Sequence, residues 1–283
     1  MLRTISNALT RNVKLQPQID FEAKLINGVA ILSGRNAFGQ LGRARRQRVI
    51  EPTAIQVRAR EAVTSTHTSL SNVYLTTHTS VLSAGLNTDK QLGHSPTHPL
   101  SESFEQVEWD FMAQGGVRQM SANGDSAGVL TNDGHVVGWG NSEYGGLCLV
   151  QETGVEPLLL SPYLDTAGCR YVRRISFAGA HSWFLDESGD IYTVGLHLMD
   201  GKVVITPTPS KVALPCKAIN IWSGVHHSIA LLEDRRLFIS GPQLDSFNVL
   251  ISEGEDESTL EHLAANNKLS MTFGLNGVSL HGT

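Results

Sequence analysis

The chain has 283 residues, 41% of them hydrophobic, and a mean hydropathy of −0.09, which is the composition of a folded protein with one large or two ordinary domains. Its formal net charge of −5 excludes the strongly basic surface that nonspecific binding to duplex nucleic acid requires. Glycine is frequent, with 27 residues, and aromatic residues make up only 6%, which favours short strands joined by tight turns. The composition therefore predicts an all-β fold.

The first 16 residues have the pattern of a targeting segment. They contain Arg3, Arg11 and Lys14 without an acidic residue, and their apolar residues recur with helical spacing. This pattern is typical of a mitochondrial transit peptide, and a frayed basic terminus is the alternative. We therefore expect a transit segment over residues 1–16, mitochondrial import, and a folded domain over residues 17–283.

A glycine-rich stretch returns along the chain at fixed spacing. "ILSGRNAFGQLG" at Ile31–Gly42 is followed by "VLSAGLNTDKQLG" at Val81–Gly93 and "GWGNSEYGGL" at Gly138–Leu147. In each copy a leucine lies seven residues after one glycine, which we call the anchor glycine. A second glycine lies five residues after the anchor, replaced by Lys90 in the middle copy. The anchors with their leucines are Gly34 and Leu41, Gly85 and Leu92, and Gly140 and Leu147.

The register extends to two further anchors, Gly195 and Gly241, so that successive anchors are 51, 55, 55 and 46 residues apart. This spacing lies in the range of propeller blades. The stretch "MTFGLNG" around Gly274 is interpreted as a decayed or cut-off sixth copy. A leucine precedes four of the anchors by ten residues; these leucines are Leu75, Leu130, Leu185 and Leu231.

Each unit has the pattern of a strand, a glycine-containing turn and a second strand, as in "GVLTNDGHVVGWG". A lone hairpin is barely stable in water, so each unit needs neighbours against its apolar faces. We expect the leucines before and after the anchors to fill the gaps between units, in equivalent positions. Full burial of each leucine contributes about 1.5 to 3 kcal/mol.

A second motif precedes the hairpins: "GAHS" at Gly179–Ser182, "GVHHS" at Gly224–Ser228, and a weaker "GDS" at Gly124–Ser126. Together with the anchored loop, this motif, with His181 and His227, resembles the repeat of the regulator of chromosome condensation family over about residues 25–245. The resemblance implies a seven-bladed β-propeller. The segments Gly85–His94 and Gly138–Leu147 are similar to a mitochondrial member of that family.

The sequence departs from the family in the number of copies. Five to six blades are recognisable, and residues 246–283 lose the signature. An unclosed propeller would expose sheet edges. The open alternatives are a short isoform, an incomplete chain, and a ring that closes with fewer blades.

Two catalytic interpretations compete with the repeat. The glycine-rich loop lacks the Lys-Ser/Thr end of a P-loop and the register of a dinucleotide turn, so we interpret it as turn geometry. His181, Ser182 and Asp186 could suggest a hydrolase triad, but adjacent residues of a strand point to opposite faces. We therefore predict structural roles for these side chains, a protein that is not an enzyme, and no cofactor.

Other reactive side chains also favour structural interpretations. Cys148, Cys169 and Cys216 are odd in number and lack C-x-x-C spacing, so we interpret them as reduced thiols. The histidines His67, His78, His94 and His98 lack the spacing of a metal site, and we expect surface or turn positions and no metal. Core and blade-packing roles are expected for the tryptophans Trp109, Trp139, Trp183 and Trp222.

Two charged segments are candidates for binding. The acidic segment "DSFNVLISEGEDEST" from Asp245 is a solvated insertion or a contact for a basic surface. The basic segment "RARRQRVIEPTAIQVRAR" is a solvated loop or a contact for rRNA, anionic lipid or an acidic partner. Its arginines are Arg43, Arg45, Arg46, Arg48, Arg58 and Arg60.

Repetition without one chemical constellation points to a binding scaffold. The resemblance implies a guanine-nucleotide exchange factor or adaptor in the mitochondrial matrix or at the inner membrane. Its partner would be a small GTPase, a ribosome-assembly GTPase or a dynamin-like fusion GTPase. The alternative is an rRNA and mitoribosome assembly scaffold that binds through the loop Arg43–Arg60. No apolar run approaches the roughly 18 residues of a membrane span, so only peripheral membrane association is expected.

Overall fold

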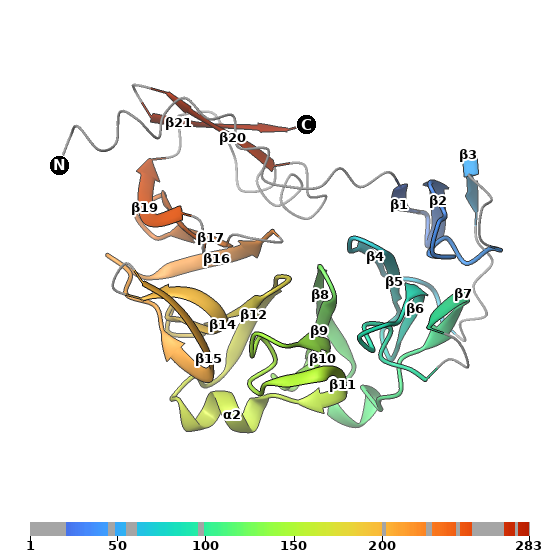
Figure 1. Cartoon of the computed structure of the whole chain (residues 1–283), viewed down its shortest axis with the longest axis horizontal. Helices are drawn as coiled ribbons and strands as arrows, with labels where there is room; N and C mark the ends of the chain where they lie inside the picture. The colour runs from blue at the N-terminus through green and yellow to red at the C-terminus, as the bar shows by residue number, and fades with distance from the viewer. Residues whose placement is uncertain are drawn as a thin grey trace.

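The computed structural model consists almost entirely of antiparallel sheets placed side by side around a common centre (Figure 1). It describes residues 21–44, 49–54, 61–95, 99–199, 202–224, 228–241, 244–250, 269–274 and 277–282. Four sheets have four strands, the first sheet has three described strands, and the last has two. The all-β propeller predicted from the sequence is confirmed.

The sheets, or blades, follow one another in chain order. Blade 1 contains β1 (Phe21–Ile26), β2 (Val29–Gly34) and β3 (Val49–Ala54). Blade 2 contains β4 (Ser65–Thr68), β5 (Asn72–Thr76), β6 (Val81–Leu86) and β7 (Leu100–Gln106). Blade 3 contains β8 (Val117–Asn123), β9 (Ser126–Thr131), β10 (Val136–Ser142) and β11 (Gln151–Leu159). Blade 4 contains β12 (Val172–Phe177), β13 (His181–Asp186), β14 (Ile191–Met199) and β15 (Lys202–Lys211).

Blade 5 contains β16 (Ala218–Ser223), β17 (Ser228–Leu232), β18 (Arg236–Gly241) and β19 (Leu244–Leu250). A sixth sheet contains β20 (Leu269–Gly274) and β21 (Gly277–Gly282). Two short helices lie between blades, the 3₁₀ helix η1 (Met112–Gln114) and the α-helix α2 (Ser161–Thr166). Within the described residues, no helix is long and apolar enough to cross a membrane.

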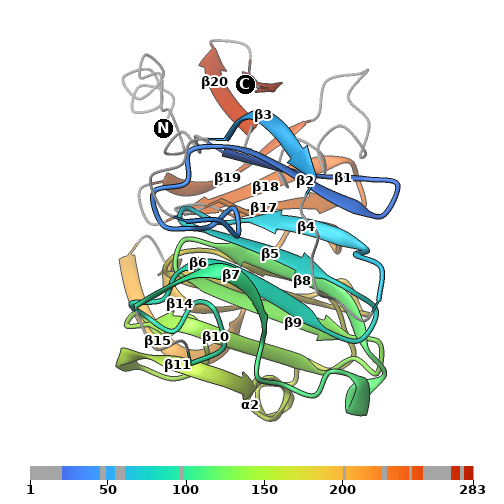
Figure 2. The same ribbon diagram turned by 90° about the vertical axis from the view of Figure 1, so that its right-hand side faces the viewer.

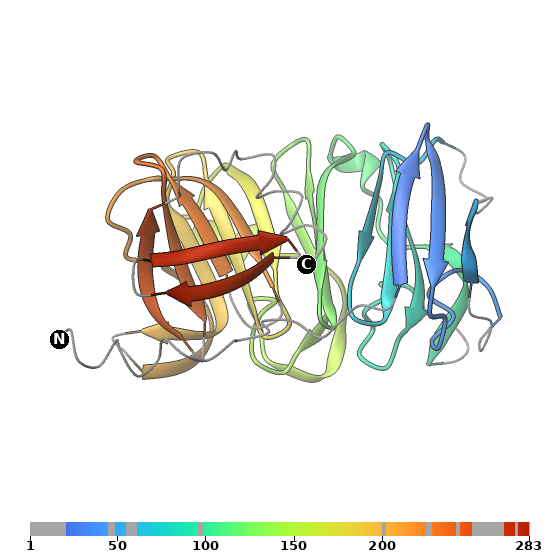
Figure 3. The ribbon, with the colours of Figure 1, turned by 90° about the horizontal axis from the view of Figure 1, so that it is seen from above.

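The first strand of each blade lies nearest the centre and the last strand lies outermost (Figure 1). Strands of successive blades stand side by side across the thickness of the ring (Figures 2 and 3). The ring therefore has two ends. We call the loop end the one where the first strand joins the second and the third joins the fourth, as at residues 124–125 and 143–150. The turn end carries the hairpins between the second and third strands, as at residues 132–135.

The anchor glycines Gly85, Gly140 and Gly195 allow the third strand to bend around a backbone carbonyl. Gly140 has a φ of +100°, and a Cβ added there would lie 2.3 Å from the oxygen of Asp125. That oxygen accepts a hydrogen bond from the N–H of Asn141 at 2.8 Å. Gly195 repeats the arrangement in blade 4, where Ala180 O accepts a bond from Leu196 N–H at 2.9 Å. Both the left-handed backbone and the missing space require glycine.

Four apolar cores fill the gaps between neighbouring blades. Between blades 3 and 4, Leu130, Val136 and Leu147 pack with Ile175 and Phe184, and each is at most 1% exposed. Similar cores join blades 1 and 2, blades 2 and 3, and blades 4 and 5. Of the repeated leucines, Leu41, Leu75, Leu130, Leu147 and Leu185 lie in these cores, as expected, and Leu92 and Leu231 are buried.

Leu75 does not occupy the position of Leu130 and Leu185. Those two leucines face the following blade, whereas Leu75 lies in the core shared with the preceding blade. The last paired residues before the turn between the second and third strands are Thr76 with Val81 in blade 2 and Leu130 with Val136 in blade 3. Four residues therefore connect these two strands in blade 2, and five connect them in blade 3. A shift of one residue moves a side chain to the opposite face of a strand. The expectation of equivalent positions is therefore wrong for Leu75, although it is fully buried.

The described residues near the C-terminus form a two-stranded sheet. β20 ends at Gly274, the glycine interpreted as the anchor of a sixth copy, and pairs with β21. Residues 246–250 of the segment without the signature belong to β19 of blade 5. The expected transit segment and residues 251–268 lie outside the described residues, so the division at residue 16 stays a prediction.

We predict that Gly140→Ala lowers the free energy of unfolding by at least about 2 kcal/mol, because the new methyl group meets the Asp125 carbonyl while the backbone keeps an unfavourable φ. Gly134→Ala in the same blade is the matched control. Gly134 also has a positive φ, but no atom lies within 4 Å of the added Cβ, so about 1 kcal/mol is expected. Urea unfolding of both variants measures the difference, and equal losses would contradict the role given to the carbonyl.

Candidate functional site

The loops that follow the anchor glycines of blades 1 to 3 share one hydrogen-bond pattern at the loop end. The side-chain oxygen of Asn36 accepts a bond from the N–H of Leu41 at 2.9 Å, and that of Asn87 accepts one from Leu92 at 2.9 Å. In blade 3 the hydroxyl of Ser142 takes this role for Leu147 at 3.1 Å. A side chain two residues after the anchor thus fixes the buried leucine seven residues after it.

The backbone of these loops keeps its shape when the residues change. Lys90 has a φ of +59°, in the left-handed region also used by Gly39 and Gly145 at the same loop position. Three positions further on, Cys148 is left-handed like Gly93. Because a lysine and a cysteine adopt the glycine conformation, the loop is a turn of fixed geometry. The structural interpretation of the glycine-rich segment agrees with this arrangement.

The tips of the loops present aromatic and acidic side chains. Phe38 and Tyr144, each four residues after its anchor, are 36% and 38% exposed. At the same position in blade 2, Asp89 accepts a hydrogen bond from the Asn141 side chain of blade 3 at 3.2 Å. Burial, with Asp89 nearby, raises the pKa of Asp125 in the next blade. The loop end is therefore a mixed apolar and acidic surface here.

Blade 4 replaces this loop with an extended hairpin, residues 196–206. β14 and β15 continue to pair beyond Gly195, as Leu196 does with Ile205. Val203 and Ile205 lie on one face of the extension and are 56% and 52% exposed. A Cβ on Gly145 would meet the backbone of Pro207, so the hairpin base packs on the loop of blade 3. We did not predict this hairpin, although a lysine stands seven residues after Gly195 where the other loops have leucine.

The Gly-x-His-Ser motif connects neighbouring blades. The Nε2 atom of His181 lies 2.7 Å from Ser228 Oγ of blade 5. Ser126 Oγ in blade 3 donates to the carbonyl of Ala178 in blade 4 at 2.8 Å. His181 and Ser182 are consecutive residues of β13 and point to opposite faces, so they do not form a base and nucleophile pair. His227 lies outside the described residues.

The histidines of the region 67–98 do not gather at one point. His67 lies on β4 beside Ser65, His78 is exposed in a turn, and His94 is buried, which lowers its pKa. His98 is outside the described residues. In the part of the chain that the structure describes, no group of three or more His, Cys, Asp or Glu side chains could hold a metal ion.

The cysteines are free thiols. Cys148 and Cys169 are buried in the core between blades 3 and 4, and Cys216 is half-buried. Burial raises the pKa of Cys148 to about 12 and also raises the pKa of Cys169. Both side chains are therefore neutral, poorly nucleophilic thiols at physiological pH.

The tryptophans divide into core and cavity residues. Trp139 and Trp183 are buried in the cores between blades, and the indole N–H of Trp139 donates to Gln91 O at 3.0 Å. Trp109 packs against the core between blades 2 and 3. Trp222 differs, because it is half-buried and lines the central cavity rather than a core between blades. The blade-packing role expected for Trp222 is therefore wrong.

The segment Arg43–Arg60 is described only in part, and the expectation of a single loop is wrong, because Val49–Ala54 within it form β3 of blade 1. Arg43 is exposed after the loop of blade 1. The other arginines of the predicted contact, Arg45, Arg46, Arg48, Arg58 and Arg60, lie outside the described residues. Binding through this segment stays a prediction.

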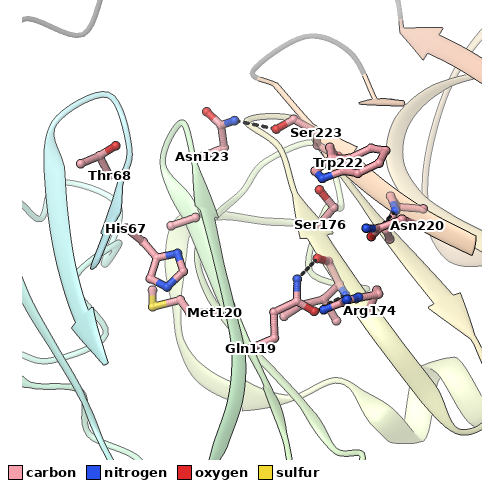
Figure 4. A pocket seen from close by; sticks show the side chains of 13 residues that line it. His67, Thr68, Gln119, Met120, Asn123, Arg174, Ser176, Asn220, Trp222 and Ser223 are labelled. Atoms are coloured by element: carbon pink, nitrogen blue, oxygen red, sulfur yellow. Dashed lines mark hydrogen bonds between the residues drawn. The ribbon is translucent and has the colours of Figure 1, made fainter. Parts of the chain in front are cut away.

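The first strands of blades 2 to 5 line an open central cavity of about 370 Å³ (Figure 4). Gln119 and Arg174 stand next to each other on its wall, and Asn220 and Trp222 come from blade 5 (Figure 4). The side-chain amide of Asn123 in blade 3 donates to Ser223 O of blade 5 at 2.9 Å, so this hydrogen bond joins two blades that are not neighbours in the chain order. The cavity is lined mostly by polar side chains and holds one arginine.

Known proteins resemble the chain in sequence over part of its length. The X-linked retinitis pigmentosa GTPase regulator of mouse is 29% identical over 130 residues, which are 46% of this chain and 13% of that protein. The Regulator of chromosome condensation of Drosophila melanogaster is 36% identical over 122 residues, which are 40% of this chain and 21% of that protein. The chain therefore matches only a small share of these relatives. No family model matches it.

Solved structures show the same fold. Human WBSCR16 has a TM-score of 0.71 at 22% identity, over 82% of this chain and 65% of that one. Yeast RCC1 (Prp20), solved with Kap60, has a TM-score of 0.64 at 15% identity, over 90% of this chain and 62% of that one. WBSCR16 is the family member, encoded in the Williams-Beuren region, to which the segments Gly85–His94 and Gly138–Leu147 are similar. The resemblance found in the sequence is confirmed.

We predict that Asn87→Ala lowers the free energy of unfolding by about 1 to 3 kcal/mol, because the buried N–H of Leu92 loses its acceptor. Asn87→Asp is the control, since a carboxylate still accepts this bond while losing the donor to His94 O. Thermal unfolding measures both variants. An alanine variant as stable as the wild type would contradict the role of the Asn87 side chain.

Proposed function

We propose that this chain, a propeller of the regulator of chromosome condensation type, is a non-catalytic regulator that binds a GTPase and speeds the release of its nucleotide. The observation that carries the proposal is its similarity to a protein named as a GTPase regulator. A second solved structure of the yeast propeller Prp20p is described with its binding properties to Gsp1p and histones. At 16% identity this likeness concerns the fold alone, and the function is inferred for our chain.

Exchange needs differential binding rather than covalent chemistry. A partner that binds the nucleotide-free GTPase more tightly than the loaded form shifts the equilibrium toward release. His181 and Ser182 could suggest hydrolysis, but His181 contacts Ser228 of blade 5 and Ser182 pairs with Val194 of the neighbouring strand β14. A rigid ring with a shaped end suits this task, because the ring itself does not have to reorganise on binding.

The hairpin 196–206 is our candidate for the GTPase contact. Its exposed Val203 and Ile205 form an apolar patch on a hairpin that continues beyond Gly195. On the loops of blades 1 and 3, Phe38 and Tyr144 add exposed aromatic side chains to the same end of the ring. Interfaces concentrate binding energy in such apolar and aromatic groups.

The mitochondrial assignment rests on the sequence. The basic, acid-free first 16 residues have the composition of an import signal. Within this proposal, the partner is a dynamin-like fusion GTPase of the inner membrane or a ribosome-assembly GTPase, with the chain in the matrix or peripherally associated with the inner membrane.

A second function is favoured by the charge of residues 43–60. Six arginines stand against one glutamate in this segment, and Arg43 at its start is exposed. Such a segment would bind rRNA phosphates and support mitoribosome assembly, with affinity that falls as salt rises.

We predict that nucleotide-free GTPase from mitochondria binds the full chain more tightly than the GDP- or GTP-loaded form, and that the chain speeds release of a fluorescent GDP analogue. The variant with Val203→Asp and Ile205→Asp should weaken binding about tenfold or more, because it loses two apolar contacts. Met112→Asp is the control, since Met112 is 62% exposed on η1 at the turn end. Equal binding of all nucleotide states would refute exchange.

Replacing Arg43, Arg45, Arg46, Arg48, Arg58 and Arg60 with glutamine separates the two functions. An exchange factor keeps its effect on nucleotide release in this variant, whereas an rRNA scaffold loses its co-sedimentation with mitoribosomes. Loss of both activities would show that the two proposals describe one surface.

A further inference from the structure

One position of the first strands carries a polar residue in three successive blades. Gln119, Arg174 and Asn220 pair with the leucines Leu130, Leu185 and Leu231 in blades 3, 4 and 5. Each of the three follows an irregularity in the strand register. The three positions are therefore structurally equivalent, and their different side chains can be compared directly.

Two of the three side chains are used by the fold. The Gln119 amide donates to Ile175 O at 2.9 Å and accepts from Ile175 N–H at 3.0 Å, which joins blade 3 to blade 4. The equivalent partner for Arg174 would be Ile221 of blade 5, but the Ile221 N–H already donates to Asn220 Oδ1 at 2.9 Å. A guanidinium has no acceptor and does not substitute for the glutamine amide.

Among the described residues, Arg174 consequently has no protein partner. Its side chain is exposed, and among the described residues no hydrogen bond or ion pair is formed with it. The preceding residue behaves differently: Arg173 donates to Asp186 O at 3.1 Å and to Ala218 O at 2.7 Å. Two adjacent arginines of β12 thus divide into one that ties blades 4 and 5 together and one that faces the central cavity.

The cavity is suited to a negatively charged ligand. Its described lining contains no aspartate or glutamate. Burial lowers the pKa of His67 to about 4, so this histidine is neutral at physiological pH and Arg174 is the one charged group of the described lining. The indole N–H of Trp222 and the hydroxyl of Ser176 also lack hydrogen-bond partners among the described residues, and both line the cavity. Unpaired donors therefore line a cavity whose described lining has no carboxylate.

We propose that the central cavity binds a small molecule bearing a phosphate or carboxylate group, with the oxyanion on the Arg174 guanidinium and a less polar part of the ligand against Trp222 (Figure 4). Planar guanidinium groups match both oxyanions with two parallel hydrogen bonds. The volume of about 370 Å³ is that of a small-molecule site and excludes a folded partner. The lining of this site shares no residue with the surface proposed for GTPase binding.

Binding there would add to the ties between blades. Asn123 already links blade 3 to blade 5 at the cavity, and the oxyanion would connect Arg174 of blade 4 with donors of blade 5. A ligand that binds only the folded ring raises its stability by mass action. The ligand therefore acts on the ring as a whole.

The test uses pyrophosphate and citrate as probes, titrated into the full chain at constant ionic strength, with calorimetry and thermal unfolding as readouts. We expect saturable binding and a higher unfolding temperature with at least one probe. Arg174→Gln should weaken that binding about tenfold or more, because it removes a charged hydrogen-bond donor. Pyrophosphate alone would identify a phosphate ligand and citrate alone a carboxylate ligand, while binding of both supports recognition of the oxyanion itself.

Arg170→Gln is the matched control, since Arg170 is exposed outside the cavity lining and loses the same charge. A second readout does not depend on the arginine variant folding: ligand should quench the fluorescence of Trp222, and Trp222→Phe should abolish that change. The proposal is overturned if neither probe binds, if both arginine variants weaken binding equally, or if the quench survives in Trp222→Phe.

Discussion

The packing of one blade against the next determines almost everything else in this molecule. A sheet of four short strands has two faces, and in blades 2 to 4 apolar side chains of both faces pack against the neighbouring blades. Leu130 and Phe184 illustrate the dependence, because each comes from a different blade and both belong to one core. Because a lone hairpin cannot supply such a core, no blade is stable without its neighbours.

Polar side chains add hydrogen bonds to this apolar packing between blades. Gln119, Ser126 and His181 each reach the following blade with a hydrogen bond. Inside a blade, the anchor glycine lets a carbonyl of the loop after the first strand lie against the third strand and accept a hydrogen bond from it. At the loop end, exposed residues such as Phe38 and Tyr144 therefore stand on loops whose turn geometry is held by hydrogen bonds.

Sequence spacing predicted the blades because the constraints behind it are local. The left-handed position of Lys90 shows that the turn geometry persists without the glycine, so the spacing is more informative than the residue type. The face that a strand residue presents was less predictable, because it depends on strand register. Blade 2 connects its second and third strands with one residue fewer than blade 3, and Leu75 points to the other neighbour as a result. Counting from the anchor does not detect this change.

The candidate sites are departures from the repeat, and this explains why they were harder to predict. The hairpin 196–206 takes the place of a loop that the sequence marks only by the missing leucine. The unusual character of Arg174 is recognised only by comparison with Gln119 and Asn220, which occupy the equivalent position of the first strand in other blades. In a repeat protein the shared residues are committed to the ring, as Gln119 is to Ile175. A charged side chain that stands at such a position without that commitment is free to interact with a ligand.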